Sequence, residues 1–441
     1  MTSHRLAAWV DGRRMGTLIY HDDTGRFAFD YTLEWLTFRS AFPLSPALPL
    51  ESPKPVIDEH HSVSVRRFFE NLLPEGKALD DAVAAHRLSK ANLYGLLLVL
   101  GRESTGAVSL LPEGVSPEQV PDSRREVTLE ELAERIRSRT HEPFNIWDGR
   151  ARMSIAGYQD KLAVYTDRNR LYLVEGRLAS THILKPEPLS PNLPFLVANE
   201  HFCLRLAGAL GLPAAGVAIL RVPEPALVVE RFDRQRRDDA VDRLHIIDAC
   251  QTLDLATSHK YERNFGSGRD VAHIRDGVGI ERLFSIADLA IAAAPMRLGL
   301  LRWTLVQYLI GNSDAHGKNV SFFVEPGGLR LAPSYDLVAA CVYPKVDHEL
   351  AMAIGDEFDI TKVRAYDWAE FAAHCGLDRR LLIREMTRMA GRLRKVLPEL
   401  QRWPGYTQDE RAIIDQIARF ALTQSDRLQA DAKLLPKVVL D

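Results

Sequence analysis

Short strand-like segments between residues 161 and 233 are the feature that most limits the possible folds of this chain. Five such segments follow one another, and all neighbours except the third and fourth are joined by short turns. Strands joined in this way form a mostly antiparallel sheet, while residues 196–211 show the helical spacing of apolar side chains. The sequence therefore predicts an α+β fold in which an antiparallel sheet carries one inserted helix.

The pattern of apolar residues changes along the chain and suggests successive parts. Three short strands within residues 5–31 predict a β-meander, and helical spacing follows up to about residue 102. Proline and charge then rise together, which indicates a linker, and the final part of the chain is mainly helical. We expect an N-terminal subdomain at 1–111, a linker at 112–127, a sheet-containing lobe at 128–236 and a helical lobe at 237–441.

Composition and charge exclude several classes of protein. A net charge of −3 and an isoelectric point near 6.6 give no overall signature of nucleic-acid or membrane binding, so such binding would need a local patch. Four widely spaced cysteines without a C-x-x-C pair argue against a zinc ribbon and a disulfide framework. The first residues do not resemble a secretory signal, and the apolar runs are too short to span a bilayer. We expect a cytoplasmic protein without a membrane partner.

A polar segment stands between a helical pattern and a strand-like pattern, at residues 312–319. The helical pattern ends at Gly311, where a C-cap glycine belongs, so the polar residues form a loop carried by a rigid helix. Within the loop, Asp314 and Asn319 have the spacing of the catalytic loop of protein kinases. There the aspartate accepts the proton of the substrate hydroxyl and the asparagine binds magnesium. Spacing alone leaves a structural turn role open.

The residues after this loop lead to a second carboxylate. Residues 320–331 read as a strand, a Pro-Gly-Gly turn and a strand, after which the chain reaches Asp336. A hairpin of this kind would bring Asp336 back beside the loop, as in kinases, where a second metal-binding aspartate follows the asparagine. Because Mg²⁺ prefers oxygen ligands, Asn319 and Asp336 together form a candidate magnesium site.

Three further segments offer groups for a nucleotide. Lys185 ends an apolar strand in the manner of the phosphate-binding lysine of kinases, with an ordinary lysine reaching into solvent as the alternative. Residues 154–161 match no phosphate-loop motif, yet their backbone amides and Lys161 are able to hold a phosphate. The strand that ends at Glu230 occupies the place of a kinase hinge, with a solvated strand end as the alternative.

Taken together, the motifs of this chain resemble those of the HipA family of bacterial serine/threonine-kinase toxins. The segments that carry the resemblance are, in the family's order, RFFENLLPEG, GRESTGAVSLLPEG, SIAGYQDK, THILKPE, VVERFDR, DACQTLDLATSHKYE, LIGNSDAHGKN and PSYDLVAA. They are spread over nearly the whole chain. The resemblance implies a divergent two-lobed protein-kinase-like fold. It also implies an ATP- and Mg²⁺-dependent protein kinase that acts as the toxin of a type II toxin–antitoxin system.

The resemblance further implies roles for single residues. Asp314 would be the catalytic base, and Asn319 and Asp336 would bind Mg²⁺. Ser154 matches the serine that family members autophosphorylate, which displaces the phosphate loop and inactivates the kinase. The residues that would contact ATP are Ala156, Gly157, Tyr158, Gln159, Asp160, Lys161, Lys185, Glu230, Arg231, Phe232, His316, Gly317, Lys318 and Tyr335.

The resemblance also implies partners. Family targets include aminoacyl-tRNA synthetases, glutamyl-tRNA synthetase among them, whose phosphorylation halts growth. The usual partner is a small helix-turn-helix antitoxin of the HipB type, which binds operator DNA and carries the toxin with it as a corepressor. A basic stripe on one helix face, formed at every fourth residue by Arg380, Arg384, Arg388 and Arg392, bears on this assembly. It is either a solvated face or a surface for DNA phosphates.

Other functions remain open on the sequence alone. A small-molecule phosphotransferase uses a similar arrangement of Asp, Asn and Asp, although the N-terminal part of this chain looks like a docking module. A non-catalytic corepressor would not need Asp314, Asn319, Asp336 and Lys185, all of which are retained. A metal hydrolase built on Asp314 and His316 fits less well, since no second histidine cluster supplies the remaining ligands.

Overall fold

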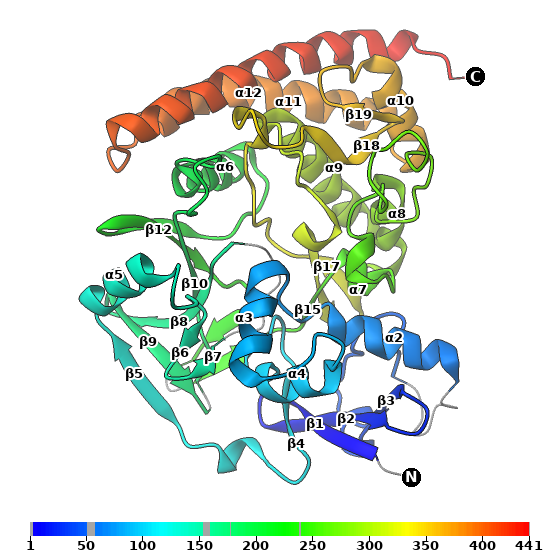
Figure 1. Cartoon of the computed structure of the whole chain (residues 1–441). Helices are drawn as coiled ribbons and strands as arrows, with labels where there is room; N and C mark the ends of the chain where they lie inside the picture. Colours follow the sequence, from blue (N-terminus) through cyan, green and yellow to red (C-terminus); the bar gives the residue numbers. More distant parts are fainter. Residues whose placement is uncertain (1–2, 51–57, 153–158, 177, 238–239, 441) are drawn as a thin grey trace. The chain divides into compact units, whose positions relative to one another are not determined.

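The computed structural model describes residues 3–50, 58–152, 159–176, 178–237 and 240–440, and Figure 1 shows their helices and strands. The chain forms two compact units. Unit 1 consists of Met1–Pro186, Leu220–Thr257 and Phe322–Gly328, and unit 2 consists of Glu187–Ile219, Ser258–Ser321 and Leu329–Asp441. Both mix helices with antiparallel strands, which confirms the predicted α+β class. Among the described residues, no helix combines the length and apolar character needed to cross a membrane.

The N-terminal meander of unit 1 is a four-stranded sheet in the order β3-β2-β1-β4. Leu6 pairs with Leu18 and Leu18 pairs with Phe29, so these three buried side chains share one face of the sheet. Helix α2 packs on this face, where the rings of Phe29 and Phe69 lie 6.0 Å apart. The elements of this part are β1 (Ser3–Val10), β2 (Arg13–His21), β3 (Arg26–Tyr31), α1 (Leu33–Leu36), α2 (Glu59–Glu70), α3 (Gly76–His86), α4 (Leu93–Leu100) and β4 (Ser109–Pro112).

The second sheet has six strands in the order β11-β12-β10-β8-β9-β5. Its strands are β5 (Ser123–Val127), β8 (Leu162–Asp167), β9 (Arg170–Glu175), β10 (His182–Pro186), β11 (Val217–Val222) and β12 (Glu224–Glu230). Strand β5 lies inside the segment predicted to be a linker, and it pairs with β9. Helix α5 (Leu129–Ser138) packs on the sheet, because Leu132 and Ile136 join Leu162 and Leu173 in one apolar cluster.

Shorter elements complete unit 1. Along the chain, the antiparallel pair β6–β7 lies between β5 and β8, and the pair β13–β14 follows β12. Strand β15 leads directly into α7, where the Asp248 side chain caps the helix. These elements are β6 (Ile146–Trp147), β7 (Arg150–Ala151), β13 (Arg234–Arg236), β14 (Val241–Arg243), β15 (Ile246–Asp248), α7 (Ala249–Thr252) and β16 (Ser321–Glu325).

Unit 2 is built mainly from helices, with one small sheet. Helices α11 and α12 lie along each other (Figure 1). Between them, Ser425 Oγ donates to the carbonyl oxygen of Ala390. Helix α9 has a mostly buried second half, which holds its C-terminal end rigidly. The elements are α6 (Leu196–Leu210), α8 (Ile280–Ser285), α9 (Ala293–Ile310), β17 (Gly328–Leu331), β18 (Glu349–Ile354), β19 (Glu357–Asp359), α10 (Ala365–His374), α11 (Arg379–Gln401) and α12 (Gln408–Leu434).

Candidate functional site

The polar loop of unit 2 starts where helix α9 ends. The helix stops at Ile310, and Gly311 adopts a left-handed conformation with a φ of 67°. A Cβ atom at this position would lie 2.6 Å from atoms of both Cys341 and Phe420, so backbone conformation and space both require glycine. The predicted helix end is therefore confirmed, and the loop leaves from a buried, rigid element.

Hydrogen bonds within the loop fix the backbone of Asp314. Its amide donates to Asn312 Oδ1 (3.1 Å), and its carbonyl oxygen accepts from the amide of His316 (2.9 Å) and from Asn319 Nδ2 (2.8 Å). The Asp314 side chain remains 60% exposed. A fixed backbone with an accessible carboxylate is the arrangement that a general base needs.

The loop is also tied to the interior of helix α9. Asn312 Nδ2 donates to Gln307 Oε1 over 2.9 Å, and both residues line a cavity of about 20 Å³ together with Trp303 and Tyr308. Within the part of the chain that the structure describes, Trp303 Nε1, Gln307 Nε2 and Tyr308 Oη are buried and find no protein hydrogen-bond partner. A cavity of this size with three such groups suits one buried water molecule, which would brace the loop from behind.

Burial and nearby charges keep His316 neutral. The side chain is buried, and burial together with the charge of Lys260 lowers the pKa of His316 to about 3. Asp336 acts in the opposite direction, and Lys318 lowers the pKa further. The imidazole is therefore uncharged at neutral pH, and the local positive charge comes from the two lysines. Positive charge beside an accessible carboxylate suits a substrate that carries phosphate groups.

Tyr335 connects the second carboxylate to the loop. Its hydroxyl donates to the carbonyl oxygen of Lys318 and is hydrogen-bonded to Ser321 Oγ, both over 2.7 Å. The next residue, Asp336, has a left-handed backbone with a φ of 56°, a conformation that is uncommon outside glycine and recurs at functional sites. The predicted strands on either side of the Pro-Gly-Gly turn are confirmed as β16 and β17. The metal-binding role of Asp336 remains a prediction.

The donor atoms of this loop fit a hard divalent cation. Asn319 Nδ2 is bonded to the Asp314 carbonyl oxygen, so the amide oxygen of Asn319 is the atom left for a ligand. Asp336 adds carboxylate oxygens, and Mg²⁺ prefers ligands of both kinds. In the described residues no group of three or more His, Cys, Asp or Glu side chains is placed to hold a metal ion. A cation here would therefore need further ligands, which the phosphates of a nucleotide provide.

Unit 1 carries the remaining predicted nucleotide residues. Lys185 lies near the end of β10, and its side chain is buried, so the alternative of a lysine extended into solvent is not supported. Gln159 Nε2 donates to the carbonyl oxygen of Pro186 over 3.2 Å. The last residues of the predicted phosphate loop therefore lie beside the lysine strand. Asp160, in the same segment, faces Arg139 at 3.8 Å, while burial raises the pKa of its carboxyl.

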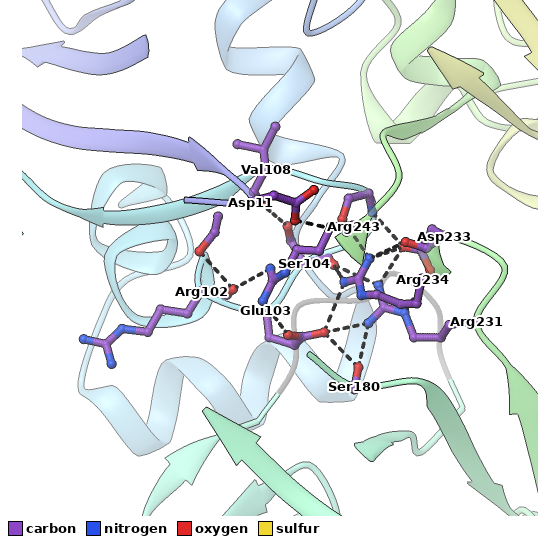
Figure 2. A network of polar contacts seen from close by, with 12 residues as sticks. Asp11, Arg102, Glu103, Ser104, Val108, Ser180, Arg231, Asp233, Arg234 and Arg243 are labelled. Carbon is purple, nitrogen blue, oxygen red and sulfur yellow. Dashed lines mark hydrogen bonds and ion pairs between the residues drawn. The ribbon is translucent and has the colours of Figure 1, made fainter. Parts of the chain in front are cut away.

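The backbone and the side chain of Arg231, a predicted hinge residue, have different surroundings. Its amide donates to the carbonyl oxygen of Thr181 over 2.9 Å, which continues the pairing of β10 and β12, and the neighbouring Glu230 is exposed. The Arg231 guanidinium turns into the interior of unit 1 (Figure 2). Only the backbone of Arg231 therefore remains for a nucleotide. The ring of Phe232 packs 6.1 Å from that of Phe323.

Figure 2 shows the network of buried and partly buried charged side chains that surrounds this guanidinium. Glu103 Oε1 accepts from Arg231 (2.9 Å) and Arg234 (3.1 Å), and Glu103 Oε2 accepts from Arg243 (3.0 Å). Asp233 Oδ2 accepts from both Arg231 (2.7 Å) and Arg234 (2.8 Å). Burial raises the pKa of Glu103, but the three guanidinium groups together outweigh it and hold the pKa at about 2. Ion pairs thus connect two motifs that are far apart in the sequence, GREST and ERFDR.

One residue near Asp314 had no predicted role. The Tyr261 hydroxyl donates to Asp314 Oδ1 over 2.6 Å, and the Tyr261 ring meets the His316 ring edge to face, with centroids 5.0 Å apart. Tyr261 lies in the segment DACQTLDLATSHKYE, which supported the family resemblance but received no function. That segment was the only sign in the sequence that Tyr261 belongs to the site.

The other predicted residues divide into two groups. Ser154, Ala156, Gly157 and Tyr158 lie outside the described residues. On α11, Arg380, Arg384 and Arg392 are exposed. Arg388 is partly buried, because it pairs with Glu385 (2.9 Å) and donates to the carbonyl oxygen of Leu210 (3.1 Å). The basic stripe therefore consists of three exposed arginines and one that has internal partners.

Comparison with known proteins gives consistent matches over nearly the whole chain. The family model for the HipA N-terminal domain matches residues 6–111, and the model for the HipA-like C-terminal domain matches residues 153–397. The serine/threonine-protein kinase toxin HipA of Shewanella oneidensis is 39% identical, over 94% of this chain and 93% of the relative. The putative kinase Y4mE of Sinorhizobium fredii is 32% identical, over 88% of this chain and 90% of the relative.

A solved structure gives the same result at the level of the fold. It is the Shewanella oneidensis MR-1 complex of HipA, HipB and its operator DNA. Its matching chain is 38% identical and has a TM-score of 0.88, and the match covers 99% of this chain and 100% of that one.

Proposed function

The chain belongs to the HipA family, and on this basis we propose that it is an ATP- and Mg²⁺-dependent serine/threonine protein kinase. The observation that carries the proposal is the loop of unit 2. There Asp314 presents an exposed carboxylate from a fixed backbone to which the Asn319 amide is bonded. In protein kinases these residue types, at this spacing, are the base and a metal ligand. The Shewanella relative is named a kinase toxin, and we propose the same toxin role here.

The residues of the loop have separate roles in phosphoryl transfer. Asp314 accepts the proton of the attacking serine or threonine hydroxyl, and the oxygens of Asn319 and Asp336 would hold Mg²⁺. When bound, Mg²⁺ neutralises charge on the phosphates. Neutral His316, Gly317, Lys318 and Tyr335 line the nucleotide in unit 2.

The remaining residues that the family resemblance assigns to the nucleotide belong to unit 1. Lys185 would bind the α- and β-phosphates, residues 156–161 would form the phosphate loop, and Glu230, Arg231 and Phe232 would offer backbone groups to the adenine. Autophosphorylation of Ser154 would switch the kinase off, because a phosphate group adds nearly two negative charges to a segment that has to accept the phosphates of the nucleotide.

The proposal is tested by incubating the purified full-length chain with Mg²⁺ and ATP and locating phosphate by mass spectrometry. We expect phosphate on Ser154, none when EDTA removes Mg²⁺, and binding of the fluorescent analogue mant-ATP. A chain that neither binds mant-ATP nor gains phosphate would favour the non-catalytic corepressor. Transfer to a sugar or an aminoglycoside, but never to protein, would favour the small-molecule phosphotransferase.

We also propose partners for this kinase. The solved relative is a complex of HipA with HipB and operator DNA, so we propose that a HipB-type helix-turn-helix antitoxin binds this chain and carries it to operator DNA. The protein substrate we propose is an aminoacyl-tRNA synthetase such as glutamyl-tRNA synthetase. Because both proposed partners act in the cytoplasm, we propose the same location for this protein.

The exposed arginines of α11 give this assembly a testable surface. The double variant Arg384→Glu/Arg392→Glu is expected to weaken operator binding by the toxin–antitoxin complex about tenfold or more, because two phosphate contacts become repulsive. Titration of labelled operator DNA at several salt concentrations gives the slope of log affinity against log salt concentration. This slope should become less steep by about two, one for each lost phosphate contact.

The control for this prediction is Arg419→Glu/Lys433→Glu on α12, which changes the net charge equally at exposed positions. If the control and the α11 variant lower the DNA affinity equally, net charge rather than the α11 surface is responsible. If the α11 variant binds operator DNA with unchanged affinity, α11 does not contact the DNA.

A further inference from the structure

Tyr261 makes the shortest described contact with the candidate base. Its hydroxyl donates to Asp314 Oδ1 over 2.6 Å, within the range of strong hydrogen bonds to a carboxylate. The two residues are 53 positions apart in the sequence, and both belong to unit 2. The Asp314 side chain is 60% exposed, so packing restrains it little and a hydrogen bond to its carboxylate affects its orientation.

The backbone on both sides of Tyr261 is held in place. On one side, the carbonyl oxygen of Lys260 accepts from the Gly317 amide of the loop itself (2.8 Å). On the other side, the Glu262 amide donates to the carbonyl oxygen of Ala351 in β18 (3.0 Å). The segment therefore bridges the catalytic loop and the small sheet of unit 2, with Tyr261 between the two anchors.

Two further contacts restrict Tyr261 itself. Gly277 lies so close that a Cβ atom there would come within 1.7 Å of the Tyr261 carbonyl oxygen, so only glycine allows this approach. The Tyr261 ring meets the His316 ring edge to face at 5.0 Å, a favourable geometry for an aromatic pair. Backbone and ring are therefore both placed before any substrate arrives, and the hydroxyl is aimed at Asp314.

We propose that Tyr261 is a positioning residue that holds the Asp314 carboxylate for proton transfer. This inference rests on the proposed kinase function and extends it. The Tyr261 hydroxyl keeps its proton and occupies Oδ1, while Oδ2 takes the proton of the serine or threonine hydroxyl. The acceptor oxygen then forms its bond to the γ-phosphorus, the bond from that phosphorus to the bridging oxygen breaks, and ADP leaves.

A carboxylate has room for both donors. Each carboxylate oxygen accepts hydrogen bonds, so the Tyr261 hydroxyl and the acceptor hydroxyl do not compete for one site. Loss of the first bond would weaken the restraint on an exposed side chain, and the carboxylate would spend less time in the orientation that reacts. The effect should therefore fall on the rate of transfer and leave nucleotide binding unchanged.

The test is Tyr261→Phe in the full-length chain, which removes the hydroxyl and keeps the ring. With Mg²⁺ and ATP, we expect the autophosphorylation rate at saturating ATP to fall about tenfold, while KM for ATP and the affinity for mant-ATP stay within twofold. The control is Tyr94→Phe in unit 1, which loses one hydroxyl bond to the Arg5 carbonyl oxygen and should keep the parental rate. Tyr261→Leu, which also removes the ring, should be slower than Tyr261→Phe.

The outcomes separate this inference from the proposed function. A parent chain without kinase activity would overturn the proposed function and this inference with it. An active parent with an unchanged or faster Tyr261→Phe variant would overturn the inference alone, a faster variant meaning that the hydroxyl blocks the acceptor. A loss of mant-ATP affinity in step with the rate would point to a structural role and would also overturn it.

Discussion

Replacing Asp314 with asparagine is expected to lower the rate of phosphoryl transfer by about a thousandfold, within the range that general base catalysis contributes. Asparagine has nearly the same shape but cannot take the proton of the acceptor hydroxyl. The backbone of residue 314 carries the bonds to Asn312, His316 and Asn319, and these bonds survive the substitution. Because the side chain is 60% exposed, the fold should also survive.

This prediction is measured on the full-length chain with Mg²⁺ and ATP. Mass spectrometry should find phosphate on Ser154 in the parent and none in Asp314→Asn over the same time. Both proteins should bind mant-ATP with affinities within a few fold of each other. The control is Asp409→Asn, an equally conservative change at an exposed position of α12. Transfer by Asp314→Asn at more than about a tenth of the parental rate would contradict the assignment of Asp314 as the base.

The parts of the site that could be predicted from the sequence are those determined by neighbouring residues. Gly311 ends α9 because its left-handed backbone suits glycine, a signal that local sequence carries. The strands on both sides of the Pro-Gly-Gly turn were likewise predicted from alternation and turn residues, and they are confirmed as β16 and β17. Asp314 and Asn319 lie within one short loop, so the sequence could place them together, although the bond from Asn319 Nδ2 to the Asp314 carbonyl oxygen was not predicted.

Contacts between distant segments had no such signal. Tyr261 reaches Asp314 across 53 positions, and Arg231 reaches Glu103 across 128. Neither contact produces a periodic pattern, and each depends on how separate segments pack. Arg231 also shows why a residue's place in a motif does not determine its side chain. Its backbone continues the strand pairing as a hinge residue should, while its guanidinium is 2% exposed inside a charge network.

That network is expected to make Glu103 one of the most sensitive positions for stability. Its carboxylate faces the guanidinium groups of Arg231, Arg234 and Arg243. In Glu103→Gln the volume is kept, but the charge is lost and amide N–H groups would face guanidinium N–H groups. Breaking a buried ion pair on one side typically costs about 3–5 kcal/mol, and we expect the free energy of unfolding to fall by about that amount. Urea unfolding measures the change, with the exposed Glu130→Gln as the control.

The pH dependence of the stability loss in Glu103→Gln shows whether the charge of Glu103 or its packing is responsible. The carboxyl of Glu103 has a pKa of about 2 in the folded chain, against an ordinary value of 4.5. The unfolded chain therefore takes up the proton first as the pH falls, so the stabilisation is complete above about pH 5 and is lost as the pH approaches 2. Glu103→Gln lacks that stabilisation at every pH. The difference in unfolding free energy between parent and variant should thus shrink between pH 5 and pH 3, whereas a constant difference would mean that packing, not charge, makes Glu103 important.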